Sequence, residues 1–282
     1  MPAERIAANL AFINWTVLAG LAIGAFATVA LAALRTQATR GFLAFTAACS
    51  LGFGLLALAS DLGLPPTVQG SPIDVAPEFD SLRRAALAIF CALVAASITS
   101  LARGGRSVPL LGAGVAAGGT ALALGALAWG GGLLDGVPLA IQLLVLAAAT
   151  GGVFAGMILG HWYLVTPKLP EQPLILVARA LLAVVAIQLV LFATWVAVGA
   201  GPGGGAAGDG PFGALVGPWA LFVWLRLIVG LLFPLVVSWA AVQTARSRSM
   251  ESATGLLYIN VGAIAAGTIL AAGLYFGAGL LV

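Results

Sequence analysis

Long apolar runs separated by short polar breaks dominate this chain. A run of 18 or more apolar residues is typical of a transmembrane helix, and about 20 residues cross a hydrocarbon core roughly 30 Å thick. Eight runs reach this length, at residues 9–34, 41–60, 83–103, 108–129, 138–165, 173–199, 219–245 and 253–281. Backbone polar groups in lipid must bond within their own segment, so each run is expected to be a helix. We predict an all-α, polytopic integral membrane protein with about eight transmembrane helices.

The breaks between the runs are too short to hold a separate soluble domain. The longest polar break covers residues 61–82, and the glycine-rich break at 199–218 has the composition of a flexible linker. We therefore predict a single transmembrane domain over residues 1–282. The break before residue 134 can divide it into two four-helix halves, 1–133 and 134–282.

Basic residues gather in alternate breaks, which predicts an orientation. The breaks after the first, third, fifth and seventh runs contain Arg35, Arg40, Arg103, Arg106, Lys168, Arg246 and Arg248. Cytoplasmic loops carry an excess of Lys and Arg. We therefore place these breaks in the cytoplasm and both termini on the non-cytoplasmic side. The expected location is the cell (inner) membrane, with membrane lipids as partners.

Composition agrees with this class and excludes others. Hydrophobic residues make up 62% of the chain, against about 45–50% in soluble domains. The net charge of +3 is spread over many breaks and forms no basic stripe, so we expect no nucleic-acid partner.

The single histidine is the first candidate for chemistry. An ionisable residue at membrane depth is costly and is a functional-site hypothesis by default. His161 ends a stripe of glycines at 152, 156 and 160, a spacing that lets helices pack closely. Residues of the last four runs reach a similar depth near the cytoplasmic side. We predict a ligand site, for a quinone or an anion, formed by His161, Tyr163, Arg179, Trp239, Tyr258 and Asn260.

Simpler interpretations of this set stay open. The aromatic residues can be ordinary interfacial residues, and Arg179 can extend to the lipid headgroups. The N-terminal half offers no matching set of polar residues, which is the main reason for placing the function in the last four runs.

Arg226 and Gln142 form a second predicted intramembrane polar site. Asp209, Asp135 and a carbonyl of a neighbouring helix are further candidate partners for Arg226, and extension of its side chain to the headgroups is the alternative. Pro234, in the same run as Arg226, removes one helical hydrogen bond and is expected to kink that helix.

The residue inventory excludes several kinds of site. A bis-histidine haem needs two histidines and the chain has one, and no multi-His or multi-Cys pattern suits zinc. We expect no haem or metal on this chain alone. No acidic residue lies inside a predicted run, which argues against a proton-coupled carrier built on buried carboxylates.

Three functions remain. The first is a membrane subunit of a respiratory-type electron-transfer complex that binds quinone or quinol near the cytoplasmic leaflet, without a haem of its own and with other subunits as partners. Eight helices without haem ligands resemble, in topology alone, the membrane anchors of polysulfide-reductase-type enzymes. The second is a transporter or channel for a small anionic or lipid-like substrate. The third is a structural scaffold subunit of a membrane complex.

Overall fold

Eight long helices form almost the whole structure. The computed structural model describes residues 1–166, 169–204 and 210–282. The described residues contain eight helices that are long and apolar enough to cross a membrane. They are α2 (Leu10–Arg35), α3 (Arg40–Leu62), α4 (Asp80–Ala102), α5 (Val108–Trp129), α6 (Gly136–Val165), α7 (Gln172–Val198), the continuous α8–η4–α9 segment (Ala220–Leu227, Ile228–Leu232 and Phe233–Arg246) and α10 (Met250–Ala278). The prediction of an all-α chain with eight membrane-length helices is confirmed.

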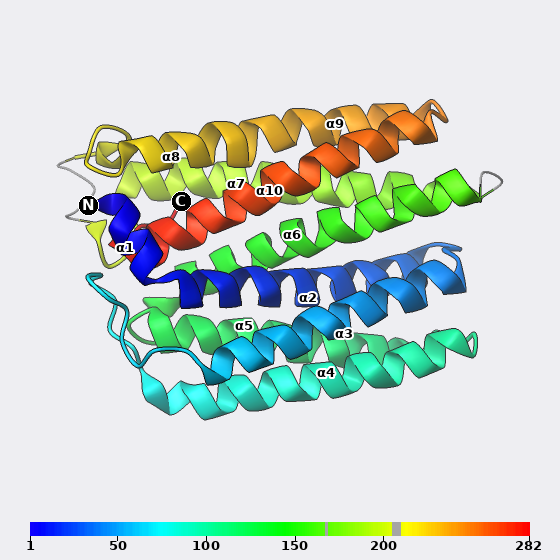
Figure 1. Cartoon of the computed structure of the whole chain (residues 1–282). Coiled ribbons are helices and arrows are strands. Elements are labelled where there is room, and N and C mark those ends of the chain that lie inside the picture. The colour runs from blue at the N-terminus through cyan, green and yellow to red at the C-terminus, as the bar shows by residue number, and fades with distance from the viewer. Residues whose placement is uncertain (167–168, 205–209) are drawn as a thin grey trace.

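In the described part of the chain, further short helical segments lie outside these eight or extend one of them. They are α1 (Pro2–Ala8), η1 (Pro77–Phe79) and η3 (Gly213–Leu215). Both termini lie at the same end of the helix bundle, as the N and C marks in Figure 1 show. A hydrogen bond of 3.2 Å from the Asn9 side chain to the Phe276 carbonyl links the start of α2 to the last turns of α10.

The helices pack as two neighbouring groups, α2 to α5 and α6 to α10, which meet where α2 lies against α6 (Figure 1). Small residues make this contact close. A Cβ added to Gly24 would lie 1.8 Å from the carbonyl oxygen of Ala147, and one added to Gly151 would lie 2.1 Å from the nitrogen of Ala25. Such contacts are typical of membrane helices whose backbones touch. They fix α6 against α2 where the two groups of helices meet.

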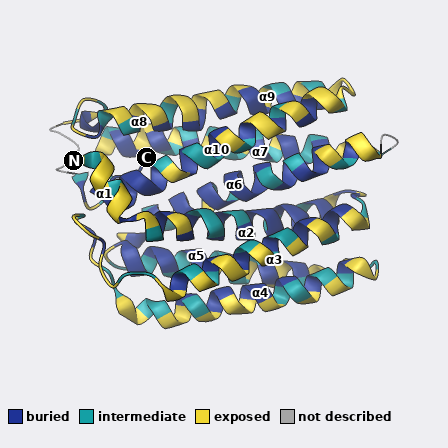
Figure 2. Ribbon diagram, viewed as in Figure 1, coloured by how far each residue is buried: buried dark blue, intermediate teal, exposed yellow. Residues whose placement is uncertain are grey.

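Burial follows the position of each helix in the bundle. Residues toward the interior are buried, whereas the outer faces are exposed, as Figure 2 shows. Exposed side chains on these faces include large apolar residues such as Phe45, Leu55 and Val190. Apolar surface of this kind suits contact with lipid chains.

Candidate functional site

His161 and Tyr258 form a polar pair between two helices. His161 lies four residues before the end of α6, and Tyr258 lies in the third turn of α10. The Tyr258 hydroxyl is 3.4 Å from Nδ1 of His161, a long hydrogen-bonding distance, and both side chains are exposed. α10 lies beside α2 near the termini but diverges toward α9 at the other end of the bundle (Figure 1).

Aromatic side chains of α3 and α6 pack against one another along the part of α6 that leads to His161. Trp162 packs on Gly41 and lies 6.4 Å from Phe45 between ring centroids, and Phe154 lies 5.3 Å from Phe53. We call this surface the α6 seam. It consists of Phe45, Phe53, Phe154, His161, Trp162 and Tyr258.

The pair can present hydrogen-bond donors to a ligand from the membrane. When Nδ1 of His161 accepts from the Tyr258 hydroxyl, the neutral imidazole carries its proton on Nε2. Nε2 is then free to donate to an acceptor such as a carbonyl oxygen.

The other predicted ligand residues do not contribute to the α6 seam. Tyr163 is 2% exposed, and its hydroxyl donates to the carbonyl of Pro170 in the turn that follows α6. Asn260 is buried and donates to the Ser238 hydroxyl over 2.8 Å, so it links α10 to α9. Arg179 and Trp239 are exposed on α7 and α9. The structure thus brings together His161 and Tyr258 from the predicted set of six.

Arg226 is buried inside the second group of helices, with only 2% of its surface exposed. Its guanidinium donates to the Gln188 side-chain oxygen over 2.8 Å and to the Gly230 carbonyl over 3.2 Å. The Gly230 carbonyl is available because Pro234, four residues later, has no N–H to donate to it. A π-helical turn over Ile228–Leu232 accommodates this break. The helix thus has a π-helical turn next to Arg226, and the kink at Pro234 stays a prediction.

Two of the predicted partners of Arg226, Gln142 and Asp135, do not bind it in the described part of the chain. Gln142 is buried, and its side-chain oxygen has no hydrogen-bond partner in the described part of the chain. Asp135 forms no ion pair with Arg226 among the described residues. Asp209 lies outside the described residues. Gln188, which the sequence did not single out, holds the guanidinium and in turn donates to the Val145 carbonyl over 2.8 Å.

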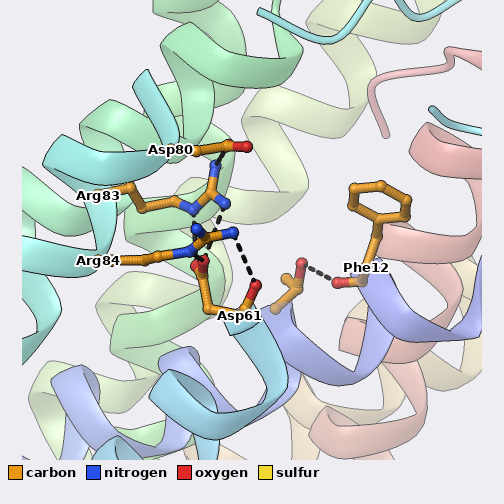
Figure 3. Close-up of polar contacts among 6 residues, drawn as sticks. Phe12, Asp61, Asp80, Arg83 and Arg84 are labelled. Carbon is orange, nitrogen blue, oxygen red and sulfur yellow. Dashed lines mark hydrogen bonds and ion pairs between the residues drawn. The ribbon is translucent and has the colours of Figure 1, made fainter. Parts of the chain in front are cut away.

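A buried ion cluster in the first group of helices was missed by the sequence analysis. Asp61 is fully buried and accepts from Nε and Nη2 of Arg83 over 2.7 and 3.0 Å, and from Nε of Arg84 over 2.8 Å. Asp80 accepts from Nη1 of Arg83 over 2.8 Å. Figure 3 shows both arginine side chains reaching from α4 to Asp61.

Two tryptophans complete the surroundings of Arg83. Its guanidinium carbon lies 4.7 Å from the ring centroid of Trp129 and 5.8 Å from that of Trp15. Cations over aromatic faces are attracted by the ring quadrupole, more strongly when desolvated. The cluster therefore links α2, α3, α4 and α5 near the termini.

This cluster corrects two statements from the sequence. The prediction that no acidic residue lies inside a span is wrong, because α3 extends to Leu62 and buries Asp61 in its last turn. The contrast between a polar C-terminal half and an apolar N-terminal half is wrong for the same reason. The missed signal was the pairing of Asp61 with Arg83 and Arg84 at the facing ends of two successive, antiparallel helices.

The described residues contain no group of three or more His, Cys, Asp or Glu side chains that could hold a metal ion. Comparison of the chain with protein-family models, curated proteins and solved structures found no match. The function therefore has to be inferred from the residues themselves.

Proposed function

We propose that this chain is a membrane subunit of an electron-transfer, respiratory-type complex and binds a quinone or quinol at the α6 seam. One observation supports this most strongly. The only histidine of the chain meets a tyrosine from another helix at an exposed position, and the neighbouring Trp162 packs near Phe45 of α3. A quinone needs hydrogen-bond donors for its carbonyls, an aromatic wall for its ring and access from lipid for its tail.

The roles of the two polar residues follow from their chemistry. Nε2 of His161 donates a hydrogen bond to one quinone carbonyl. The Tyr258 hydroxyl orients the imidazole through Nδ1. A quinone exchanges electrons only with another redox centre, so the proposal includes partner subunits that contain one.

The proposed depth of the site is the cytoplasmic leaflet of the inner membrane. The bundle end that contains His161 also contains the arginines at the ends of α2, α4 and α9 and at the start of α3. Under the positive-inside rule this end faces the cytoplasm. Lys168, which supports the same orientation by sequence, lies outside the described residues.

Binding of a short-tail quinone to single-residue variants tests the proposal. The dissociation constant of ubiquinone-1 is measured by quenching of tryptophan fluorescence in detergent micelles. His161→Ala and Tyr258→Phe should each weaken binding about fivefold, because a neutral hydrogen bond contributes roughly 1 kcal/mol. Tyr163→Phe is the matched control, since it removes a hydroxyl from the same helix outside the seam. Unchanged binding in both seam variants, or an equal loss in the control, would reject the quinone site.

The alternative function, binding or transport of a small anion, rests on Arg226. Its buried guanidinium has no carboxylate partner among the described residues, and its Nε has no hydrogen-bond partner there. Uptake of radiolabelled phosphate or chloride into liposomes, lost in Arg226→Gln and retained in His161→Ala, would favour this function over quinone binding.

A further inference from the structure

A narrow apolar crevice lies on the side of α6 opposite to His161. Gly152 lines it, and the nine residues from Gly152 to His161 correspond to about two and a half helical turns, so the two face opposite ways. The crevice has a volume of about 150 Å³. Its lining comes from α2, α6 and α7, namely Gly24, Ala27, Thr28, Leu31, Ala148, Gly152, Val177, Ala180, Leu181 and Val184.

The walls of the crevice suit hydrocarbon. Its one polar lining side chain, Thr28, donates its hydroxyl to the Gly24 carbonyl of its own helix over 2.9 Å. Small residues leave the space open, since a Cβ added to Gly152 would meet no other atom closer than the Thr28 oxygen at 3.6 Å. An apolar cavity of roughly 150 Å³ can hold a benzene-sized group. A whole helix, about 10 Å across, is too wide for it.

A cation lies at the end of the crevice where lipid headgroups are expected. Arg35 is the last residue of α2 and follows Leu31 of the lining by one helical turn on the same face. It is exposed and forms none of the ion pairs found within the described residues.

The start of α7 adds to the positive character of this end. Val177 of the lining lies in the second turn of α7, whose N-terminus has a partial positive charge. Glu171, at that N-terminus, is paired with Arg248. The acidic side chain nearest to the helix start is therefore already neutralised.

We propose that this crevice holds one acyl chain of an anionic phospholipid whose phosphate binds Arg35. The chain lies along α2 from Leu31 toward Gly24, a rise of about 10 Å. The phosphate meets the guanidinium and the N-terminal end of α7. This lipid site is separate from the α6 seam and does not depend on quinone binding.

Native mass spectrometry of the full chain tests the proposal with two probes, dioleoyl phosphatidylglycerol and dioleoyl phosphatidylcholine in equal amounts. The wild-type chain should retain more phosphatidylglycerol. Arg35→Gln should lower that retention about fivefold, since a cation near anionic headgroups contributes roughly 1 kcal/mol. Gly152→Leu should lower retention of both lipids by filling the crevice. Arg103→Gln, an exposed cation at the same end, and Gly119→Leu, a glycine with open space around it, are the matched controls.

The result that overturns the proposal is an equal loss in Arg35→Gln and Arg103→Gln, or full retention in Gly152→Leu. Loss of a co-purifying protein from Gly152→Leu with unchanged lipid retention also overturns it, because a protein would then fill the crevice. If Gly152→Leu fails to fold, Ala148→Leu is a second variant that fills the crevice, since Ala148 is a half-buried residue of its lining. His161→Ala should leave lipid retention unchanged, so that failure of the quinone site and of the lipid site can be told apart.

Discussion

Asp61→Asn removes the central charge of the buried ion cluster. In the native chain the Asp61 carboxylate accepts three hydrogen bonds from Arg83 and Arg84 at 2.7 to 3.0 Å, and Asp61 and Arg83 are at most 1% exposed. The variant leaves two guanidinium groups with Asp80 as the only carboxylate bonded to either among the described residues.

The expected loss of stability is large because the partner that remains is buried. Removing one member of a buried ion pair typically costs about 3–5 kcal/mol, since the other charge stays desolvated. A loss of this size corresponds to a fall in the midpoint of thermal unfolding on the order of 10 °C for a chain of this length. Arg84 is 35% exposed on its side chain, so Arg84→Gln should cost about 1 kcal/mol or less.

Intrinsic tryptophan fluorescence during heating in detergent is a suitable assay, because Trp15 and Trp129 flank Arg83. The double variant Asp61→Asn/Arg83→Met should recover part of the loss, since it removes the stranded charge. Unfolding midpoints of Asp61→Asn and Arg84→Gln that lie within about 2 °C of each other would refute a buried ion pair of this strength. Such a gap corresponds to a difference of under about 1 kcal/mol in the free energy of unfolding.

Two further variants test the packing of the bundle and the surroundings of Arg226. Gly24→Ala should sharply reduce the monodisperse yield in size-exclusion chromatography, because its Cβ would lie 1.8 Å from the Ala147 oxygen. The control Gly52→Ala, which has open space around it, should keep the native yield. Equal yields of the two variants would contradict the close α2–α6 contact. Gln188→Leu should lower the free energy of unfolding by about 1.5–3 kcal/mol in chemical unfolding, because it removes a hydrogen bond to the buried charge of Arg226. A loss no larger than that of an exposed substitution such as Val190→Ala would show that Gln188 does not hold the guanidinium.

The eight spans were predictable because one physical requirement, satisfaction of the backbone in lipid, leaves a strong pattern in the chain. The ends of the spans were harder to place. The second run was predicted to end at residue 60, and the helix in fact continues to Leu62. Those two residues decide whether Asp61 is a loop residue or the centre of an ion cluster.

The candidate site was predictable only in part. A sequence indicates how far along a helix a residue lies, but it says less about which side of the helix the side chain is on. His161, Tyr258 and Asn260 lie toward the same end of the bundle, as expected, but Asn260 turns inward to Ser238 and Tyr163 turns toward Pro170. In helices that are apolar on every side, little hydrophobic contrast exists to show which face meets a neighbour.

The partner of Arg226 shows a second limit. Gln188 is 38 residues away in the chain, and nothing in its local sequence marks it. By contrast, the spacing of Arg226, Gly230 and Pro234 at intervals of four residues contains a readable signal. A proline frees the carbonyl four residues earlier, and an arginine four residues before that carbonyl can reach it.

Photo-crosslinking with an azido-substituted quinone tests the quinone site most directly. The labelled peptides are identified by mass spectrometry after irradiation of the protein in membranes. We expect adducts on residues 154–162 of α6 or near Tyr258 of α10, suppressed by excess ubiquinone and lost in His161→Ala. Adducts that lie only in the α2–α7 crevice or around Arg226, or that persist in His161→Ala, would contradict the assignment of the α6 seam as a quinone site.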